Sequence, residues 1–279
     1  MIYIGSYNAL KVVKKSDIGI YLGTDEESVF LPKRKAPEDV KIGDELTVFV
    51  YTDSQDRPIA TTEQPLAVVG EFACLRVKDV NPIGAFMDWG LDKDLLVPFK
   101  HQFHRMEKGR QYIVRLCLDE KSGRVIGVGK LSRFFSKNPN DLDVGQKVSL
   151  LVYGFTEPGI MVIVNNLYAG MLYRNETFEK MFIGNRWEGY VKKIRDDGKV
   201  DVSLQQQGHL AIDDAKVVVT EKLKEAGGFL PLHDKSDPED IRKVLKLSKK
   251  AFKKAVGGLL KSGDISIEEN GIRLLEKKT

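Results

Sequence analysis

Apolar and polar residues alternate with a period of two along most of the first 204 residues of this chain. β-branched residues are frequent in these stretches, and Gly or Asp residues interrupt them at short intervals. Alternation of this period is typical of strands that bury one face, whereas an amphipathic helix repeats every 3.6 residues or so. The pattern therefore predicts many short strands from residue 1 to residue 204.

A sequence element that occurs three times divides this β-rich region. Each copy contains a glycine followed by hydrophobic residues, and then a second apolar pair that opens a loop. The copies occupy residues 16–36, 81–102 and 157–176. A second shared phrase, in which a glycine precedes an alternating strand, occupies residues 41–53, 107–127 and 181–204. Three repeated units of this length favour three small five-stranded barrels over one large sandwich.

Helical spacing replaces the alternation after residue 208, and lysines become dense. Helices are expected over residues 211–226, 237–246 and 248–263. Asp237 and Ser248 are suited to cap the second and third helices, and Gly263 is suited to end the third. Two short strands are expected over residues 264–269 and 271–276, joined by an Asn-Gly turn. Three helices and a β-hairpin in this order predict a winged helix.

The third of these helices has an apolar side and a basic side. Its apolar stripe is formed by Phe252, Val256, Leu259 and Leu260. The basic residues on the remaining surface are Lys249, Lys250, Lys253 and Lys254. A lysine-rich helix face is often only solvated, but on a recognition helix these side chains are candidates for contact with a nucleic-acid backbone.

The predicted chain is thus mainly β, with an α+β domain at its C-terminal end. The expected domains span residues 1–62, 63–140, 141–208 and 209–279. Their formal net charges are −2, +4, −1 and +3, within a total of +4. Positive charge is therefore concentrated in the second and fourth domains, which is weak support for a polyanionic partner.

Several classes of protein find no support in the sequence. No signal peptide or membrane-spanning run is recognisable, and the two cysteines, Cys74 and Cys117, are expected to be free thiols of a cytoplasmic protein. His101 and His104 form an H-x-x-H pair, but no second ligand pair has zinc-like spacing, so we expect no metal. No nucleotide-binding glycine motif, nucleophile elbow or acid–base cluster is present. We therefore expect no catalytic residues, no cofactor and no enzyme.

The repeated element resembles a known RNA-binding family. The letters GAFM at 84–87, followed by LVP at 96–98, resemble the S1 domain, which is a five-stranded barrel of the OB type. The letters GIYL at 19–22 and GIMV at 159–162 match it less closely. The longer succession GAFMDWGLDKDLLVPFK is similar to the bacterial conserved virulence factor B family, whose members join three S1 domains to a winged helix. The resemblance covers essentially the whole chain.

This resemblance implies which aromatic residues face RNA. By family position, the aromatic residue two places after the motif glycine does so, which points to Tyr21 and Phe86, with Met161 in the third copy. The family often has another aromatic residue three places earlier, and here those positions hold Ile18, Ile83 and Pro158. It also often has a histidine after the apolar pair, and here those positions hold Pro32, Pro98 and Tyr173. Tyr173 is the best candidate among the last three, and the main RNA contact is expected around Phe86.

Other residues of the second copy are further candidates. Trp89 could join Phe86, or it could pack inward, because a spacing of three places the two on opposite faces of a regular strand. A β-bulge would reverse that expectation. Lys100, Arg105 and Arg110 follow the motif and could contact phosphate, although a solvated loop face explains them equally well.

The resemblance implies a non-enzymatic protein that binds single-stranded RNA through its barrels and regulates gene expression after transcription. Aromatic stacking and contacts from Lys or Arg to phosphate would provide the binding. Two alternatives stay open: a DNA-binding regulator that acts through the winged helix, and an adaptor that binds proteins. The third helix has no arginine, which counts against base-specific reading of DNA. No membrane partner is expected, and the oligomeric state is open.

Overall fold

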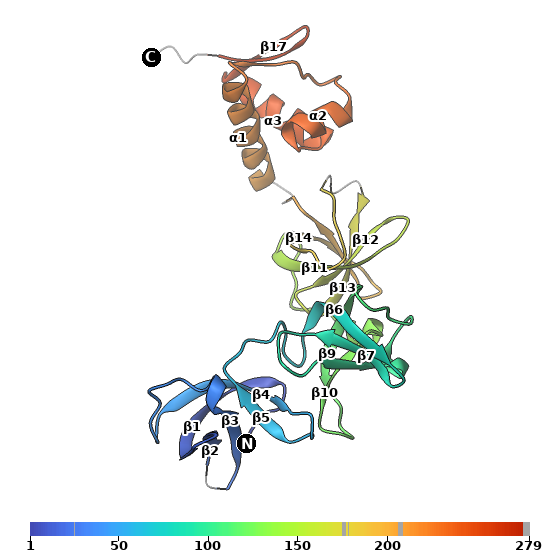
Figure 1. The fold of residues 1–279 in the computed structure, drawn as a ribbon. Helices are drawn as coiled ribbons and strands as arrows, with labels where there is room; N and C mark the ends of the chain where they lie inside the picture. Colours follow the sequence, from blue (N-terminus) through green and yellow to red (C-terminus); the bar gives the residue numbers. More distant parts are fainter. Residues whose placement is uncertain (25, 175–176, 178, 206–208, 276–279) are drawn as a thin grey trace. The chain divides into compact units, whose positions relative to one another are not determined.

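The structure is a computed structural model that describes residues 1–24, 26–174, 177, 179–205 and 209–275. The chain folds as two compact units. The first contains residues 1–135, 151–153 and 182–186, and the second contains residues 136–150, 154–181 and 187–279. Figure 1 shows the strands and helices coloured in chain order.

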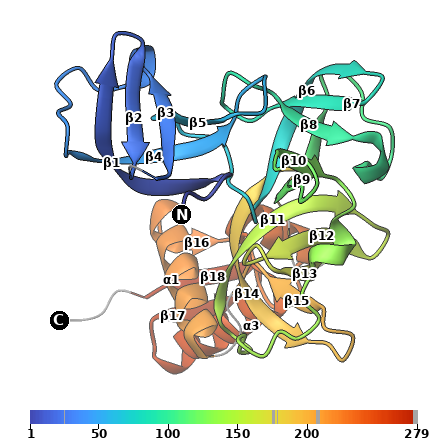
Figure 2. The ribbon, with the colours of Figure 1, turned by 90° about the horizontal axis from the view of Figure 1, so that it is seen from below.

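Three closed five-stranded barrels follow one another along the chain, and Figure 2 shows the first of them in blue. The first barrel consists of β1 (Ser6–Ser16), β2 (Gly19–Gly23), β3 (Ser28–Pro32), β4 (Glu45–Thr52) and β5 (Pro58–Thr61). The second consists of β6 (Phe72–Asn81), β7 (Gly84–Asp88), β8 (Leu95–Pro98), β9 (Gln111–Leu118) and β10 (Val125–Val128). The third consists of β11 (Lys147–Phe155), β12 (Gly159–Val164), β13 (Tyr168–Tyr173), β14 (Arg186–Ile194) and β15 (Val200–Ser203). Short 3-10 helices are η1 (Lys33–Lys35), η2 (Phe99–His101) and η3 (Leu131–Phe134).

The three barrels share one topology. In each, the strands neighbour one another in the order first, second, third, fifth, fourth. The third and fifth strands are parallel, whereas pairs such as β1–β2, β7–β8 and β14–β15 are antiparallel. Burial alternates along the third strand of every barrel, so one face of the strand lines the barrel core and the other faces outward.

The structure explains why a glycine recurs at the start of the second strand of each barrel. Gly19, Gly84 and Gly159 each begin the second strand of a barrel and lie opposite the last residue of the third strand. A Cβ atom at any of them would come within 2.3–2.4 Å of a carbonyl oxygen of the facing strand. The second and third strands therefore approach each other too closely for any residue other than glycine.

The C-terminal region forms α1 (His209–Glu225), α2 (Pro238–Leu245) and α3 (Lys249–Lys261), with a sheet of β16 (Phe229–Leu230), β18 (Gly271–Leu274) and β17 (Ile265–Glu268). The predicted caps are present. The carboxylate of Asp237 accepts a hydrogen bond from the Glu239 N–H at 2.7 Å, and the hydroxyl of Ser248 accepts one from the Ala251 N–H at 3.2 Å. Three helices and a small sheet confirm the predicted fold class of barrels followed by a winged helix, while the exact domain boundaries stay predictions.

One member of the predicted apolar stripe of α3 does not belong to it. Phe252, Val256 and Leu259 are buried, but Leu260 is 46% exposed. Successive helical residues are about 100° apart, so the residue after Leu259 turns away from the core that the other three share. The strand β16, which pairs with β18, had no signal in the sequence pattern.

Among the described residues, no helix is both long and apolar enough to cross a membrane. The same part of the chain contains no group of three or more His, Cys, Asp or Glu side chains placed to hold a metal ion. Cys74 and Cys117 are free and half-buried, and burial raises the pKa of both thiols.

Candidate nucleic-acid interface

The outward face of the first barrel carries two aromatic rings and a lysine side by side. Tyr21 on β2 pairs across the sheet with Phe30 on β3, and their ring centroids are 5.3 Å apart at 53°. Lys14 on β1 is the other cross-strand partner of Tyr21, and its ammonium lies 5.8 Å from the centre of the Tyr21 ring. Phe30 in turn pairs with Ile59 on β5. We call these four residues the first-barrel row.

The first-barrel row has the features of a stacking platform. Tyr21 and Phe30 are half-buried, while Ile20 and Leu22 on either side of Tyr21 point into the core. The rings are therefore fixed on strands yet reachable from solvent, which is what stacking of bases on aromatic side chains requires. Lys14 adds a positive charge at the edge of the platform, where a phosphate of a bound strand would lie.

The corresponding row of the second barrel is less suited to a polyanion. Phe86 on β7 pairs with Leu96 on β8 and with Asp79 on β6. Leu96 pairs in turn with Ile126 on β10. Phe86 is half-buried and faces outward, as expected from its place in the motif. It is the single ring of this row, however, and Asp79 occupies the position that Lys14 has in the first barrel.

The row of the third barrel contains no aromatic ring. Met161 on β12 pairs with Met171 on β13, which pairs with Asp201 on β15. Asp201 faces Lys193 on β14 and has Arg195 at 3.8 Å. Tyr173 lies at the end of β13, opposite Gly159, and is half-buried.

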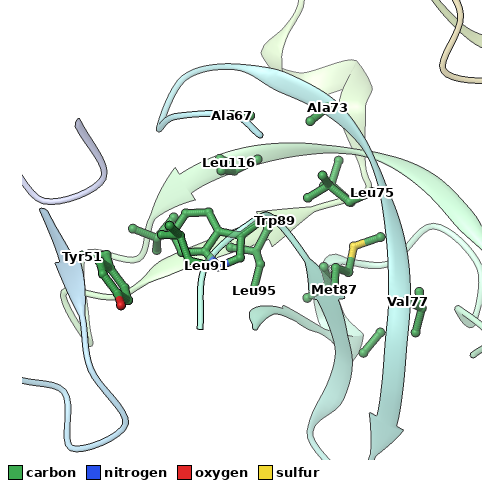
Figure 3. Close-up of a cluster of buried hydrophobic side chains, with 14 of the residues drawn as sticks. Tyr51, Ala67, Ala73, Leu75, Val77, Met87, Trp89, Leu91, Leu95 and Leu116 are labelled. Carbon is green, nitrogen blue, oxygen red and sulfur yellow. The ribbon is translucent and has the colours of Figure 1, made fainter. Parts of the chain in front are cut away.

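Trp89 lies inside the protein and not on the face that Phe86 occupies. It is 2% exposed, and its indole N–H donates a hydrogen bond to the Lys93 carbonyl. Its ring meets those of Phe49 and Tyr51 edge-on, with centroids 5.8 and 6.1 Å apart. Figure 3 shows Trp89 and Leu91 beside Tyr51, which comes from strand β4. This placement removes Trp89 from the candidate RNA contacts, because the ring has no accessible face.

A charged network accompanies this buried aromatic cluster. The ammonium of Lys35, whose side chain is 6% exposed, lies 2.8 Å from Asp92 and also bonds to Glu63. Burial disfavours the charge on Lys35, but the hydrogen bonds to Asp92 and Glu63 outweigh that penalty and raise its pKa. Arg34 contacts the same Asp92 at 2.6 Å. The first two barrels are thus joined by a shared apolar cluster and by ion pairs at its edge.

The three cations expected to contact phosphate have different surroundings. Arg110 lies 3.0 Å from Glu107, so a carboxylate already accompanies it. Arg105 places its guanidinium 3.6 Å from the centre of the Phe99 ring. Lys100 is exposed and shares one loop with Arg105.

The lysines of α3 also separate into two kinds. Lys249 is half-buried and donates a hydrogen bond to the Ser236 carbonyl at 2.9 Å. Its ammonium group therefore binds the loop before α2. Lys250, Lys253 and Lys254 are exposed on α3. These three present their ammonium groups on the surface of the helix, as a contact with a nucleic-acid backbone requires, and Lys261 in the last turn of α3 is exposed as well.

Sequence reasoning missed Lys14 and Phe30. The signal for Phe30 was present in the letters SVFLP, since alternation places Phe30 and Pro32 on the face opposite Val29 and Leu31. Lys14 had no comparable signal. A β-bulge between Val12 and Lys14 sets the register that brings Lys14 opposite Tyr21.

Comparisons with known proteins agree with this architecture. The family model described as S1 domain matches residues 4–63, which hold the first barrel, and the model described as CvfB-like winged helix domain matches residues 218–274. The uncharacterized protein YitL of Bacillus subtilis (strain 168) is 31% identical over 278 residues, which cover 96% of this chain and 92% of YitL. Conserved virulence factor B of Staphylococcus epidermidis is 27% identical over 284 residues, covering 98% of this chain and 95% of that protein. The chain belongs to the conserved virulence factor B family.

A solved structure offers a further likeness. A multidomain protein with nucleic acid binding domains from Streptococcus pneumoniae has 27% sequence identity and a TM-score of 0.44, over 98% of both chains. For this member of the conserved virulence factor B family, the S1 and winged-helix domains support nucleic-acid binding. Neither matched domain family is an enzymatic one.

Proposed function

We propose that the protein is a non-enzymatic RNA-binding protein that binds single-stranded RNA through its barrels and regulates gene expression after transcription in the cytoplasm. The observation that carries this proposal is the first-barrel row. Two rings 5.3 Å apart with a lysine beside them match the combination that binds unpaired nucleotides. Aromatic side chains stack on bases, and cations contact the backbone phosphates.

The barrels are proposed to contribute unequally, with the first ahead of the second and the second ahead of the third. The first has two rings and Lys14, the second has Phe86 beside Asp79, and the third has two methionines beside Asp201. Lys14 places a positive charge beside the ring in the first barrel, whereas in the second barrel Asp79 holds that position and pairs with Lys108 at 3.2 Å. In the third barrel, a thioether has no π-face on which a base can stack. The sequence favoured Phe86 as the main contact, and the cross-strand partners shift the proposal to Tyr21 and Phe30.

An alternative is duplex DNA binding through the winged helix. The exposed Lys250, Lys253 and Lys254 on α3 favour contact with a phosphate backbone there. Lysine contacts of this kind bind without selecting a sequence, because bidentate Arg–guanine pairs are the commonest specific readout. We therefore propose a supporting role for the winged helix, namely backbone contact, in addition to the barrels.

The test is the affinity of the full chain for labelled oligo(U), oligo(A) and oligo(G) at low salt. Tyr21→Ala and Phe30→Ala are each expected to weaken binding by about 5- to 150-fold, which corresponds to the loss of one base stack. Phe86→Ala should have a smaller effect, and Met161→Ala, the matched position in the third barrel, the smallest. The absence of measurable affinity of the wild-type chain for any of the three oligonucleotides would contradict the proposal.

A further inference from the structure

The loop after β8, residues 99–106, displays a phenylalanine to solvent. Phe103 is 75% exposed, more than any other phenylalanine of the described part of the chain. The ring of His104 stands against it edge-on, with centroids 4.6 Å apart. The exposed part of this ring takes no part in the barrel core and is therefore accessible to a ligand.

The loop holds this ring in a fixed place. Gln102, which is 5% exposed, donates a hydrogen bond to the Val97 carbonyl at 2.9 Å and accepts one from the Met106 N–H at 3.0 Å. Met106 belongs to the barrel core. The carbonyl of His101 accepts bonds from two further N–H groups, those of Gly129 and Lys130. Residues on both sides of Phe103 are therefore anchored, and a ring on an anchored loop loses less conformational entropy when a ligand binds.

The surroundings of the ring are basic. Residues 99–106 contain Lys100 and Arg105 and no carboxylate. The Arg105 guanidinium lies 3.6 Å from the centre of the Phe99 ring, and Arg105 is exposed two residues after Phe103 in the same loop. Burial lowers the pKa of His101, and the positive charges of Lys100 and Arg133 lower it further, while Asp119 acts in the opposite direction. The loop therefore carries a positive potential around an exposed ring.

We propose that residues 99–105 form a second stacking site for single-stranded nucleic acid, separate from Phe86. Phe103 stacks on a base, and Arg105 and Lys100 contact the adjoining phosphates. The chemistry selects this ligand over an apolar protein surface or a lipid layer, because the neighbours of the ring are cationic and polar. The inference rests on the proposed function and extends it to a surface outside the rows of the barrels.

The two sites of the second barrel are connected by one strand. Phe86 pairs with Leu96 and Gly84 pairs with Pro98, and both Leu96 and Pro98 face outward from β8. The loop begins at the next residue, Phe99, whose N–H donates to the Ile83 carbonyl at 3.4 Å. β8 therefore leads from the cross-strand partner of Phe86 to the start of the loop that carries Phe103, and its four residues include no carboxylate.

The experiment compares three substitutions at Phe103 in the full chain, with labelled oligo(U) as the probe. Phe103→Ala and Phe103→Leu are expected to weaken binding by about 5- to 150-fold, the range for one lost stack, whereas Phe103→Trp retains or raises affinity. Leucine keeps an apolar side chain but has no π-face, so it separates stacking from hydrophobic docking. Phe155→Ala, which removes a 50% exposed phenylalanine from β11, is the matched control and should leave affinity unchanged.

Each outcome has a definite meaning. Unchanged affinity of Phe103→Ala, or loss with Phe103→Ala but full affinity with Phe103→Leu, overturns the second stacking site. If Tyr21→Ala weakens binding in the same assay while Phe103→Ala does not, the proposed function stands and this inference alone fails. Photocrosslinking of a 4-thiouridine oligonucleotide gives an independent readout: crosslinks are expected within residues 99–105, and a map without them contradicts the site.

Discussion

Replacement of Trp89 by alanine should destabilise the first two barrels. The indole is 2% exposed, contacts the rings of Phe49 and Tyr51 edge-on, and donates its N–H to the Lys93 carbonyl (Figure 3). Removing it leaves a cavity between residues of both barrels and an unsatisfied carbonyl. The sequence alone allowed the opposite outcome, in which Trp89 joins an RNA platform and its loss affects binding.

The size of the effect follows from the burial of the ring. A buried tryptophan covers roughly 150–250 Å², which at about 25 cal/mol/Å² gives about 4–6 kcal/mol as an upper bound on the lost free energy of unfolding. Large-to-small substitutions of core aromatic residues cost about 3–5 kcal/mol, which agrees with that bound. Trp89→Phe keeps most of the ring and loses the hydrogen bond, so it should cost about 1–3 kcal/mol.

Hydrogen exchange read out by mass spectrometry is the suitable assay, because a chain of several domains does not unfold in one step. Trp89→Ala should raise the exchange rates of β4 and β7 amides and leave those of α3 unchanged. Phe86→Ala, on the outward face of β7, is the control and should change exchange little. Wild-type exchange in Trp89→Ala together with weakened RNA binding would refute the assignment of Trp89 to the core.

Substitutions at three further positions test other parts of the fold. Gly84→Ala should destabilise the second barrel by about 1–3 kcal/mol, because its Cβ would meet the Val97 carbonyl oxygen at 2.4 Å, and should raise hydrogen exchange of the β7 and β8 amides; wild-type exchange there would contradict the close approach. Asp237→Ala should cost about 1 kcal/mol of winged-helix stability through the lost N-cap, whereas Asp237→Asn should cost less; equal losses would contradict capping. Burial and the hydrogen bond to Asp141 raise the pKa of Tyr168 to about 12. Because the unfolded pKa is about 10, the stabilisation that Tyr168 provides is complete below that pH and is lost as the pH rises towards 12. Tyr168→Phe should remove the last-titrating tyrosine from the tyrosinate absorbance curve, and an unchanged curve would contradict the shift.

Local patterns were sufficient to predict the barrels and the caps. The period of two along the first 204 residues and the glycine of each repeat predicted the strands. Both signals can be recognised within one short segment of sequence. Asp237 and Ser248 were recognisable as caps for the same reason: a cap acts on the N–H groups two or three residues ahead of it.

The site depended on register and on contacts between distant segments, which local patterns do not contain. Lys14 meets Tyr21 only because a β-bulge shifts β1 by one residue. Trp89 is buried because Phe49 and Tyr51, from a different barrel, cover it. Lys249 was grouped with its neighbours as a basic face, but the Ser236 carbonyl, thirteen residues away, binds its ammonium. Residue type was therefore enough to propose candidates for RNA contact, but the tertiary structure determines which of their side chains are accessible to RNA.

The central claim is that the barrels bind unpaired RNA. The most direct measurement is a competition in which the full chain, bound to labelled single-stranded RNA, is challenged with unlabelled RNA of the same sequence or with duplex DNA of equal length. We expect the single strand to compete far better, and affinity to fall steeply as salt increases, because cations such as Lys14 release counterions from the phosphates. Tyr21→Ala should reduce the preference for the single strand. Equal or better competition by the duplex, with Tyr21→Ala indistinguishable from the wild-type chain, would contradict the claim.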